Sequence, residues 1–104
     1  MKVRIDRVVH HKIDMFYDVA LSLHDTLGEQ AVTNKKNRMY SSLRELGEYA
    51  EIYSRARLKD EWINLGYREF ICEDFHFAYE ICVNSSGERF VWIHDAVHSL
   101  LYHN

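Results

Sequence analysis

Two amphipathic segments dominate the first half of the chain. Apolar residues recur at helical spacing from Ile13 to Leu27, where Gly28 ends the run, and a second apolar stripe extends from Val32 to Ala50. This i, i+3, i+4, i+7 spacing predicts two helices that each bury one face. Because glycine commonly ends a helix and a single glycine separates the stripes, the helices are expected to form an antiparallel hairpin.

The segments on either side of this hairpin have different patterns. Val3, Ile5 and Val9 share one side of an extended chain, which predicts a short edge strand before the helical period begins near residue 11. The pattern over residues 51–65 fits either a longer second helix or an irregular crossing, and the sequence leaves both open.

Three segments of the second half have the composition of β-strands. They are rich in aromatic and β-branched residues, and tight turns at Glu73-Asp74 and at residues 84–87 separate them. We therefore expect a three-stranded antiparallel meander. Its strands cover residues 67–72, 75–83 and 89–95.

Pairing about these turns predicts which side chains share a face of the sheet. It places Phe70 opposite Phe77 in the first hairpin and Tyr79 opposite Trp92 in the second. One face then carries the large aromatic side chains and is expected to meet the helices. Its members are Phe70, Phe75, Phe77, Tyr79, Ile81, Phe90 and Trp92. The other face carries Ile71, Ala78, Val91 and Ile93 among Glu69, Glu73, His76, Glu80 and Asp95.

The expected element order is β-α-α-β-β-β. This is an α+β architecture of two layers, in which a helical hairpin packs on an antiparallel sheet. The chain has 104 residues, of which 47% are hydrophobic and 28% are charged. These figures are typical of one globular domain, here residues 1–104, and exclude disordered and coiled-coil chains.

The net charge does not favour nucleic-acid binding. Thirteen Lys and Arg stand against sixteen Asp and Glu, which gives −3, whereas most nucleic-acid binders have a basic excess. The acidic excess is confined to the second half of the chain, because residues 59–104 contain three basic and eight acidic residues.

Three features predict a cytoplasmic protein with reduced thiols. The N-terminal segment is too charged for a secretory signal peptide, and no window approaches the eighteen or so consecutive apolar residues of a membrane-spanning helix. The two cysteines, Cys72 and Cys82, are too few for a disulfide scaffold. On the predicted hairpin their separation exceeds the ~7 Å between Cα atoms that a disulfide allows.

Five short motifs follow one another through the predicted meander. They are Tyr67-Arg68, Asp74-Phe75, Tyr79-Glu80-Ile81, Val91-Trp92-Ile93 and His98. Their order and spacing resemble the C-terminal half of the RelE/ParE family, the toxins of bacterial toxin–antitoxin (plasmid stabilisation) systems. The preceding strand and helical hairpin agree with the element order of that family, so the resemblance covers nearly the whole chain.

The resemblance implies a cytoplasmic toxin that a cognate antitoxin silences and that needs no cofactor. One branch of the family consists of mRNA interferases, which cut mRNA on the ribosome, and another inhibits DNA gyrase by binding it. The expected partners are therefore the antitoxin and either the ribosome with its mRNA or gyrase.

RNA cleavage of this kind needs a base for the ribose 2′-hydroxyl, a cation for the phosphorane charge and an acid for the leaving oxygen. The resemblance assigns the cation to Arg68 and the acid or base to His98. Tyr102 completes the catalytic set, and Tyr67 is expected to stack on an RNA base. A purely structural interpretation is also open, in which Arg68 pairs with a carboxylate, His98 caps the last turn and the tyrosines complete the core.

A second group of candidate residues lies on the outer face of the second helix. Lys35, Lys36 and Arg38 are predicted to contact RNA phosphates, although a charge run of this kind is commonly only solvated.

The chain departs from the family pattern at three places. Asp95 and Leu100-Leu101 stand where the family commonly has arginines, and His76 stands where a middle-strand arginine is frequent. Each lost cation removes a phosphate contact. The alternative is therefore a catalytically inert RelE/ParE-fold protein that acts only as a protein-interaction module.

The remaining histidines predict no metal site. His94 and His98 have the i, i+4 spacing of helical metal ligands, but they begin in a predicted strand and lack a third ligand. His24 lies on the apolar stripe of the first helix and is expected to be a buried imidazole.

A partner segment is expected to dock on the second face of the sheet. That face mixes apolar residues with carboxylates, so the segment should carry apolar anchors flanked by Lys or Arg.

Overall fold

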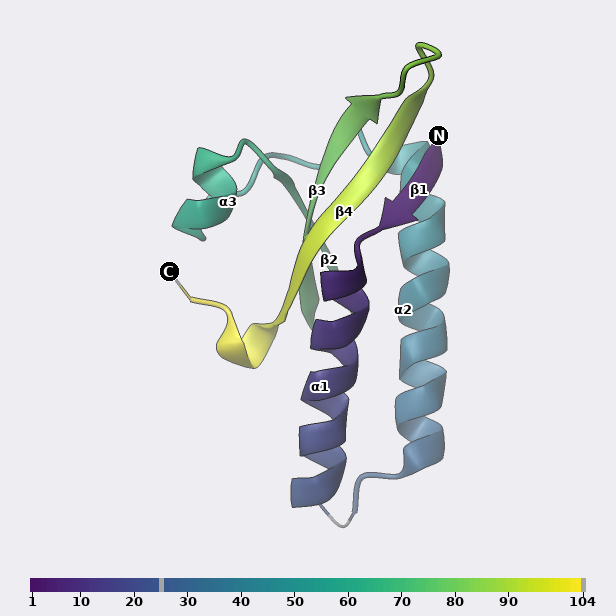
Figure 1. Cartoon of the computed structure of the whole chain (residues 1–104). Helices are drawn as coiled ribbons and strands as arrows, with labels where there is room; N and C mark the ends of the chain where they lie inside the picture. Colours follow the sequence, from purple (N-terminus) through teal and green to yellow (C-terminus); the bar gives the residue numbers. More distant parts are fainter. Residues whose placement is uncertain (25, 104) are drawn as a thin grey trace.

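The computed structural model describes residues 1–24 and 26–103. Four strands form one sheet in the order β1-β4-β3-β2 (Figure 1). The elements are β1 (Lys2–Ile5), α1 (Arg7–Leu23), α2 (Glu29–Tyr49), α3 (Asp60–Asn64), β2 (Arg68–Cys72), β3 (Phe75–Val83), β4 (Arg89–His98) and the 3-10 turn η1 (Ser99–Leu101). The α+β class and the two main layers are confirmed, with α3 as an additional element.

The sheet is mixed, whereas a wholly antiparallel sheet was expected. β1 runs parallel to β4. After β1 the helices lead the chain to β2 at the opposite edge of the sheet, and the meander then brings β4 beside β1. The pairs β2–β3 and β3–β4 are antiparallel, as the meander predicts.

The first strand ends earlier than its apolar pattern suggests. The side chain of Asp6 accepts a hydrogen bond from the backbone N–H of Val8 at 3.0 Å, which caps α1 at its N-terminus. The helix therefore begins at Arg7, and the predicted strand residue Val9 is instead a fully buried helical residue.

The C-terminal end of α1 also differs from the prediction. The helix stops at Leu23, so His24 is the C-terminal cap, with an extended backbone and an exposed side chain. The expectation that His24 is buried is wrong, because the apolar period continues beyond the last helical residue.

The helical hairpin packs on one face of the sheet, and their contact forms the main core. Aliphatic residues of both helices meet aromatic residues of β3, and the Tyr79 hydroxyl donates to the carbonyl of Ala50 at 2.6 Å. Fully buried members of this core include Val9, Ile13, Met39, Leu43, Leu46, Phe75, Phe77, Tyr79, Val91 and Ile93.

The β2–β3 hairpin has the predicted register, but the β3–β4 hairpin does not. Phe70 faces Phe77 as expected, whereas Tyr79 faces Ile93 rather than Trp92. The cause is the turn between the strands, which contains one residue more than predicted. The side-chain oxygen of Asn84 accepts from the backbone N–H groups of Ser86 and Glu88, both at 2.9 Å, and this holds a five-residue loop over residues 84–88.

The shifted register exchanges the faces of β4. Val91 and Ile93 lie in the main core, and Phe90 and Trp92 lie on the opposite face, so the predicted face assignments of these four residues are wrong. A second irregularity, a β-bulge between Ala78 and Tyr79 on the β3 side, leaves His94 of β4 without a partner in the ladder.

The opposite face of the sheet is partly covered. The segment 51–65 is a loop followed by α3, and Trp62 of α3 is fully buried against Ala78. Ala56, Tyr67, Val97 and Tyr102 complete this second cluster. The apolar surface on which a partner segment was expected to dock is not formed as predicted. Val91 and Ile93 lie in the main core and Ala78 lies beneath α3, while Ile71 is exposed.

Both cysteines are free thiols. Cys72 faces Phe75, and Cys82 lies seven residues further along β3, which corresponds to about 23 Å of strand. Within residues 1–24 and 26–103, no helix is both long and apolar enough to cross a bilayer.

The close approach of the N-terminus to α2 generates a test of the packing. A Cβ atom added at Gly47 would lie 2.0 Å from the carbonyl oxygen of Met1 and 3.2 Å from a methyl group of Val3. We predict that Gly47→Ala lowers the free energy of unfolding by about 1–3 kcal/mol, despite the better helix propensity of alanine. Urea unfolding measures this, with Ser41→Ala on the exposed face of α2 as the control. A stabilising Gly47→Ala would contradict the packing of β1 on α2.

Candidate functional site

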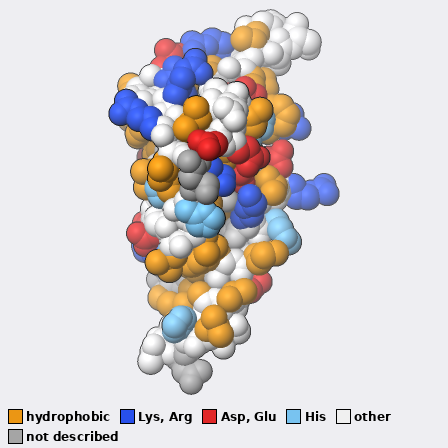
Figure 2. Space-filling model, turned by 90° about the vertical axis from the view of Figure 1, so that its left-hand side faces the viewer, with side chains coloured by type: hydrophobic (Ala, Val, Ile, Leu, Met, Phe, Trp, Pro, Cys, Tyr) orange, Lys and Arg blue, Asp and Glu red, His pale blue; other side chains and the backbone are white. Residues whose placement is uncertain are grey.

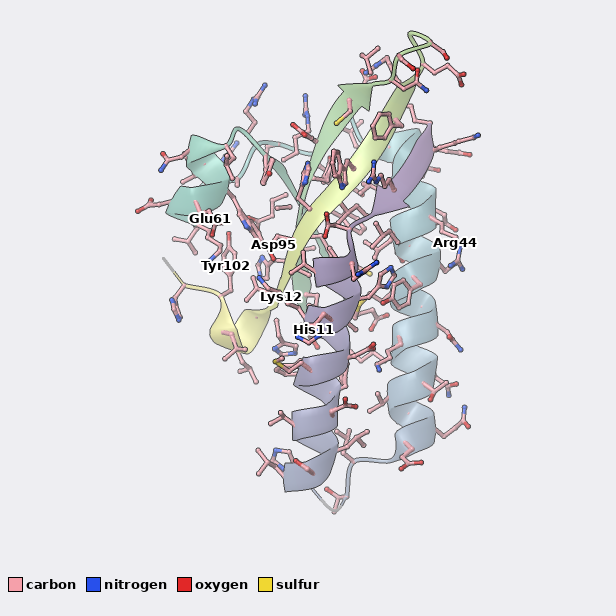
Figure 3. The ribbon with its side chains drawn as sticks, in the orientation of Figure 1. His11, Lys12, Arg44, Glu61, Asp95 and Tyr102 are labelled. Atoms are coloured by element: carbon pink, nitrogen blue, oxygen red, sulfur yellow. The ribbon has the colours of Figure 1, made fainter. Side chains whose placement is uncertain are left out.

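A group of polar side chains that bond to one another lies on the sheet face opposite the helical hairpin. The C-terminal tail brings Tyr102 over this face, toward the sheet and α3 (Figure 3). The Tyr102 hydroxyl donates to Glu69 at 2.5 Å, and its ring stacks on His76 with centroids 3.9 Å apart. His76 Nδ1 lies 2.9 Å from Glu69, and its Nε2 lies 3.1 Å from the hydroxyl oxygen of Ser99.

These four residues, Glu69, His76, Ser99 and Tyr102, form the His76 cluster. Each hydrogen-bond donor in the cluster has an acceptor. The Ser99 hydroxyl donates to the carbonyl of Asp74 at 2.8 Å, so its oxygen can accept from His76 Nε2–H. His76 Nδ1–H can then donate to Glu69. Both ring nitrogens of His76 are therefore engaged within the cluster.

Tyr102 is held in its neutral form. Burial, together with the hydrogen bond to Glu69, raises the pKa of Tyr102 far above its usual value. The phenol therefore acts as a fixed hydrogen-bond donor at neutral pH and orients Glu69.

His98 is placed by aromatic contacts at the end of β4. Its ring stacks on Phe16 of α1, with centroids 3.8 Å apart, and meets Phe75 edge-on. Its Nδ1 accepts from the backbone N–H of Leu100 at 3.1 Å, which caps η1. Burial lowers the pKa of His98, so the neutral imidazole that this cap requires is favoured.

Arg68 contacts the backbone of the loop before α3. Its guanidinium donates to the carbonyl of Tyr53 at 2.6 Å and approaches that of Glu51 at 3.4 Å. These contacts hold the loop against the edge strand β2.

The structure does not bring the three predicted catalytic residues together. Arg68 pairs with Tyr79, whereas His98 pairs with Phe75, which is four residues or about 13 Å away along β3. Both strand positions belong to the helix-facing side of the sheet, while Tyr102 packs on the other side with Trp62.

The candidate phosphate-binding residues of α2 are all engaged in ion pairs. Lys35 binds Asp74 at 2.8 Å, and Arg38 binds Glu73 at 3.0 Å, so both contacts tie α2 to the β2–β3 turn. The hydrogen bond between Lys35 and Asp74 raises the pKa of Lys35 and lowers that of Asp74. Lys36 binds Asp14 of α1 at 2.9 Å.

Tyr67 belongs to a stack of side chains that the sequence analysis missed. Its ring lies parallel to His94, with centroids 4.6 Å apart, and His94 contacts Trp92 at 4.5 Å. The guanidinium of Arg4 covers Trp92 at 4.3 Å, and His94 also bonds to Glu80 at 2.9 Å. The ring of His94 thus already covers one face of the Tyr67 ring. The sequence signal for this stack was the spacing of Trp92 and His94, which lie two residues apart on one strand and so share a face. The predicted register concealed it, because it placed Trp92 in the core.

The described residues contain no group of three or more His, Cys, Asp and Glu side chains able to hold a metal ion. His94 and His98 lie in the extended strand β4 and make separate contacts, to Glu80 and to Phe16.

A groove of about 510 Å³ runs between α1 and the C-terminal turn. Hydrophobic side chains gather with histidines over the lower half of the face drawn in Figure 2. Lys12 at one end of the groove binds Asp95 at 2.5 Å, and Trp62 Nε1–H donates to the same carboxylate at 3.0 Å. The lining residues are Lys12, Met15, Phe16, Val19, Ala20, Leu23, His24, Phe75, Ala96, Val97, His98, Leu100 and Leu101.

Comparison with protein-family models, with curated proteins and with solved structures finds no match to this chain. The resemblance to the RelE/ParE family therefore depends on its sequence motifs.

The bond between Tyr102 and Glu69 generates a pH-dependent prediction. Tyr102→Phe leaves Oε1 of Glu69 without its donor, and we expect the free energy of unfolding to fall by about 1–3 kcal/mol at pH 7. The folded protein keeps the Tyr102 proton above the usual pKa of 10.0, at which the unfolded chain loses it, so the wild type loses stability as the pH rises above 10.0.

The difference between the wild type and Tyr102→Phe should therefore narrow above this pH. Urea unfolding from pH 7 to pH 11 measures it, with the exposed Tyr49→Phe as the control. A difference that stays constant over this range would contradict the buried environment of the Tyr102 hydroxyl.

Proposed function

We propose that this chain is a catalytically inert RelE/ParE-like protein that acts only as a protein-interaction module and binds a partner such as a cognate antitoxin. The observation that carries the proposal is the separation of Arg68, His98 and Tyr102. A transition-state cation must face the reacting phosphate together with the acid and the base. Arg68 instead donates to the Tyr53 carbonyl, and Tyr102 lies on the other side of the sheet.

The charge distribution supports the same conclusion. The three candidate cations of α2 are paired with carboxylates, and the half of the chain that resembles the chemical half of the family has more acidic than basic residues. Phosphate binding gains its free energy from cations that release counterions. A surface of this charge offers few such contacts.

The second candidate function is ribosome-dependent mRNA cleavage, and one observation favours it. The His76 cluster places an imidazole and a phenol each within hydrogen-bond distance of the Glu69 carboxylate, on the sheet face opposite the helical hairpin. These are groups that general acid–base chemistry uses. Against it, the bonds within the cluster already occupy both nitrogens of His76.

Induced expression in a bacterial host separates these functions. The proposal predicts normal growth and intact mRNA. Growth arrest with mRNA fragments would support the endonuclease, and arrest with DNA-damage signalling would support a binding inhibitor directed at gyrase. Either form of arrest would contradict an inert interaction module.

The contacts of Arg68 give a prediction for a single variant. Arg68→Ala removes the donor from the Tyr53 carbonyl, and we expect the free energy of unfolding to fall by about 1–3 kcal/mol. If the protein affects growth, Arg68→Ala should weaken that effect only as much as the lower amount of folded protein explains. The exposed Arg57→Ala, on the same loop, is the matched control for loss of one positive charge.

Urea unfolding and growth curves, measured with folded protein at equal levels, test both parts. Wild-type toxicity that Arg68→Ala abolishes without loss of stability would show that the guanidinium acts on a substrate.

A further inference from the structure

The surface formed by α1 and the neighbouring η1 carries apolar side chains that the described part of the chain leaves exposed (Figure 1). Met15, Val19 and Leu23 recur every four residues along α1, and their exposed fractions are 52%, 51% and 70%. We call these three residues the α1 ridge. Across the groove, Leu100 and Leu101 of η1 are 82% and 57% exposed. Contiguous apolar surface of this kind on a globular domain marks an interaction site.

The groove beside the ridge is preformed. The ring of His98 stacks on Phe16 of α1 and meets the edge of Phe75, and its Nδ1 accepts from the N–H of Leu100. The same imidazole therefore fixes α1 and η1 relative to each other. An occupant of the groove has little ordering of the protein to bring about.

The lining of the groove has almost no free charge. In the part of the chain that the structure describes, its titratable side chains are Lys12, His24 and His98. Lys12 binds Asp95, and His98 is neutral where it accepts from the Leu100 N–H. The exposed His24 lies at one end. A nucleic acid, an anionic membrane or a charged peptide therefore finds little in the groove to select it.

The same surface can complement itself in a symmetric pair. The α1 ridge lies directly beside the groove, so a two-fold axis along α1 can place the ridge of each copy in the groove of the other. Met15 and Leu23 are eight positions apart, or about 12 Å, and the groove follows α1 over about 18 Å, so the ridge is short enough to enter it. In such a pair the two α1 helices run parallel, and each ridge residue lies close to its own copy. A free charge in the lining would then repel itself, and the neutral lining avoids this repulsion.

The exposed apolar area suits a reversible dimer. The five side chains of the ridge and η1, each more than half exposed, offer on the order of 500 Å² per copy. Stable interfaces bury about 600 Å² or more on each partner, and the remaining lining residues of the groove bring this area within reach. We expect association at micromolar concentration and not a permanent complex.

We propose that the α1–η1 groove is the interface of a symmetric homodimer, in which the α1 ridge of each copy occupies the groove of the other and the two α1 helices run parallel. A second copy supplies a ridge that matches the groove and brings no unpaired charge to it except His24 at the end of the helix. The dimer does not depend on the proposed function.

Sedimentation equilibrium of the purified full chain, over a roughly hundredfold range of concentration around the micromolar, measures the association. We expect the mass to rise from that of one chain to that of two. Val19→Asp and Leu100→Asp should each raise the Kd of the dimer by about tenfold or more, because each places a carboxylate in the apolar contact. Ile52→Asp, which alters a 73% exposed residue outside the groove, should leave the Kd unchanged. Because each chain has a net charge of −3 and the lining is neutral, added salt should not weaken the dimer.

Cysteine crosslinking tests the arrangement of the helices. Under mild oxidation Met15→Cys should form a covalent dimer with itself, whereas Ile52→Cys should not. The wild type, with its half-buried Cys72 and Cys82, gives the background. A crosslink that forms only when Met15→Cys is mixed with Leu23→Cys would show antiparallel helices and overturn the proposed arrangement.

Circular dichroism checks the fold of each variant. A chain that stays monomeric at every concentration would overturn the homodimer, and so would a dimer that neither Val19→Asp nor Leu100→Asp weakens. Growth arrest with mRNA fragments would overturn the proposed function and leave these results unchanged.

Discussion

The pairing of β3 with β4 decides which side chains of this protein are buried and which can meet another molecule. β3 is a central strand that bonds to β2 on one side and to β4 on the other, and residues of β3 and β4 form the centre of the main core. Side chains of a strand alternate between faces, so a shift of one residue moves each of them to the other side. The loop held by Asn84 sets this register, and the position of Trp92, His94 and the aliphatic core residues of β4 follows from it.

Much of the fold could be predicted from the sequence, because the relevant signals are local. The helical stripes identify α1 and α2, and the two-residue turn at Glu73-Asp74 sets the β2–β3 register correctly. Asp6 is the N-terminal cap of α1, so its side chain was a sequence signal that β1 ends early. The alternation of Val3, Ile5 and Val9 instead suggested a longer strand. The loop at 84–88 was predicted one residue too short, since the alternating pattern does not show how an asparagine side chain closes a turn.

The candidate site could be predicted less well, because it depends on contacts between distant segments. The motifs identify Arg68, His98 and Tyr102 as residues of interest, yet nothing local indicates that Arg68 donates to a loop carbonyl fifteen residues earlier. The pairing of Lys35 with Asp74 spans 39 positions of the chain. The cap that His98 forms on the last turn was among the structural interpretations of the sequence, and the structure confirms it. The sequence placed His76 on the same sheet face as Glu69 and marked it as a departure from a family pattern, but its bonds to Glu69 and Ser99 emerge only in the fold.

The central claim is that this protein works through binding and not through RNA cleavage. The most direct measurement adds the purified chain to ribosomes translating a defined mRNA and maps the 5′ ends of the RNA by primer extension. The account predicts the same set of ends as in the reaction without the protein. New ends inside the coding sequence that disappear with Arg68→Ala or with a His98 variant of unchanged fold would contradict it.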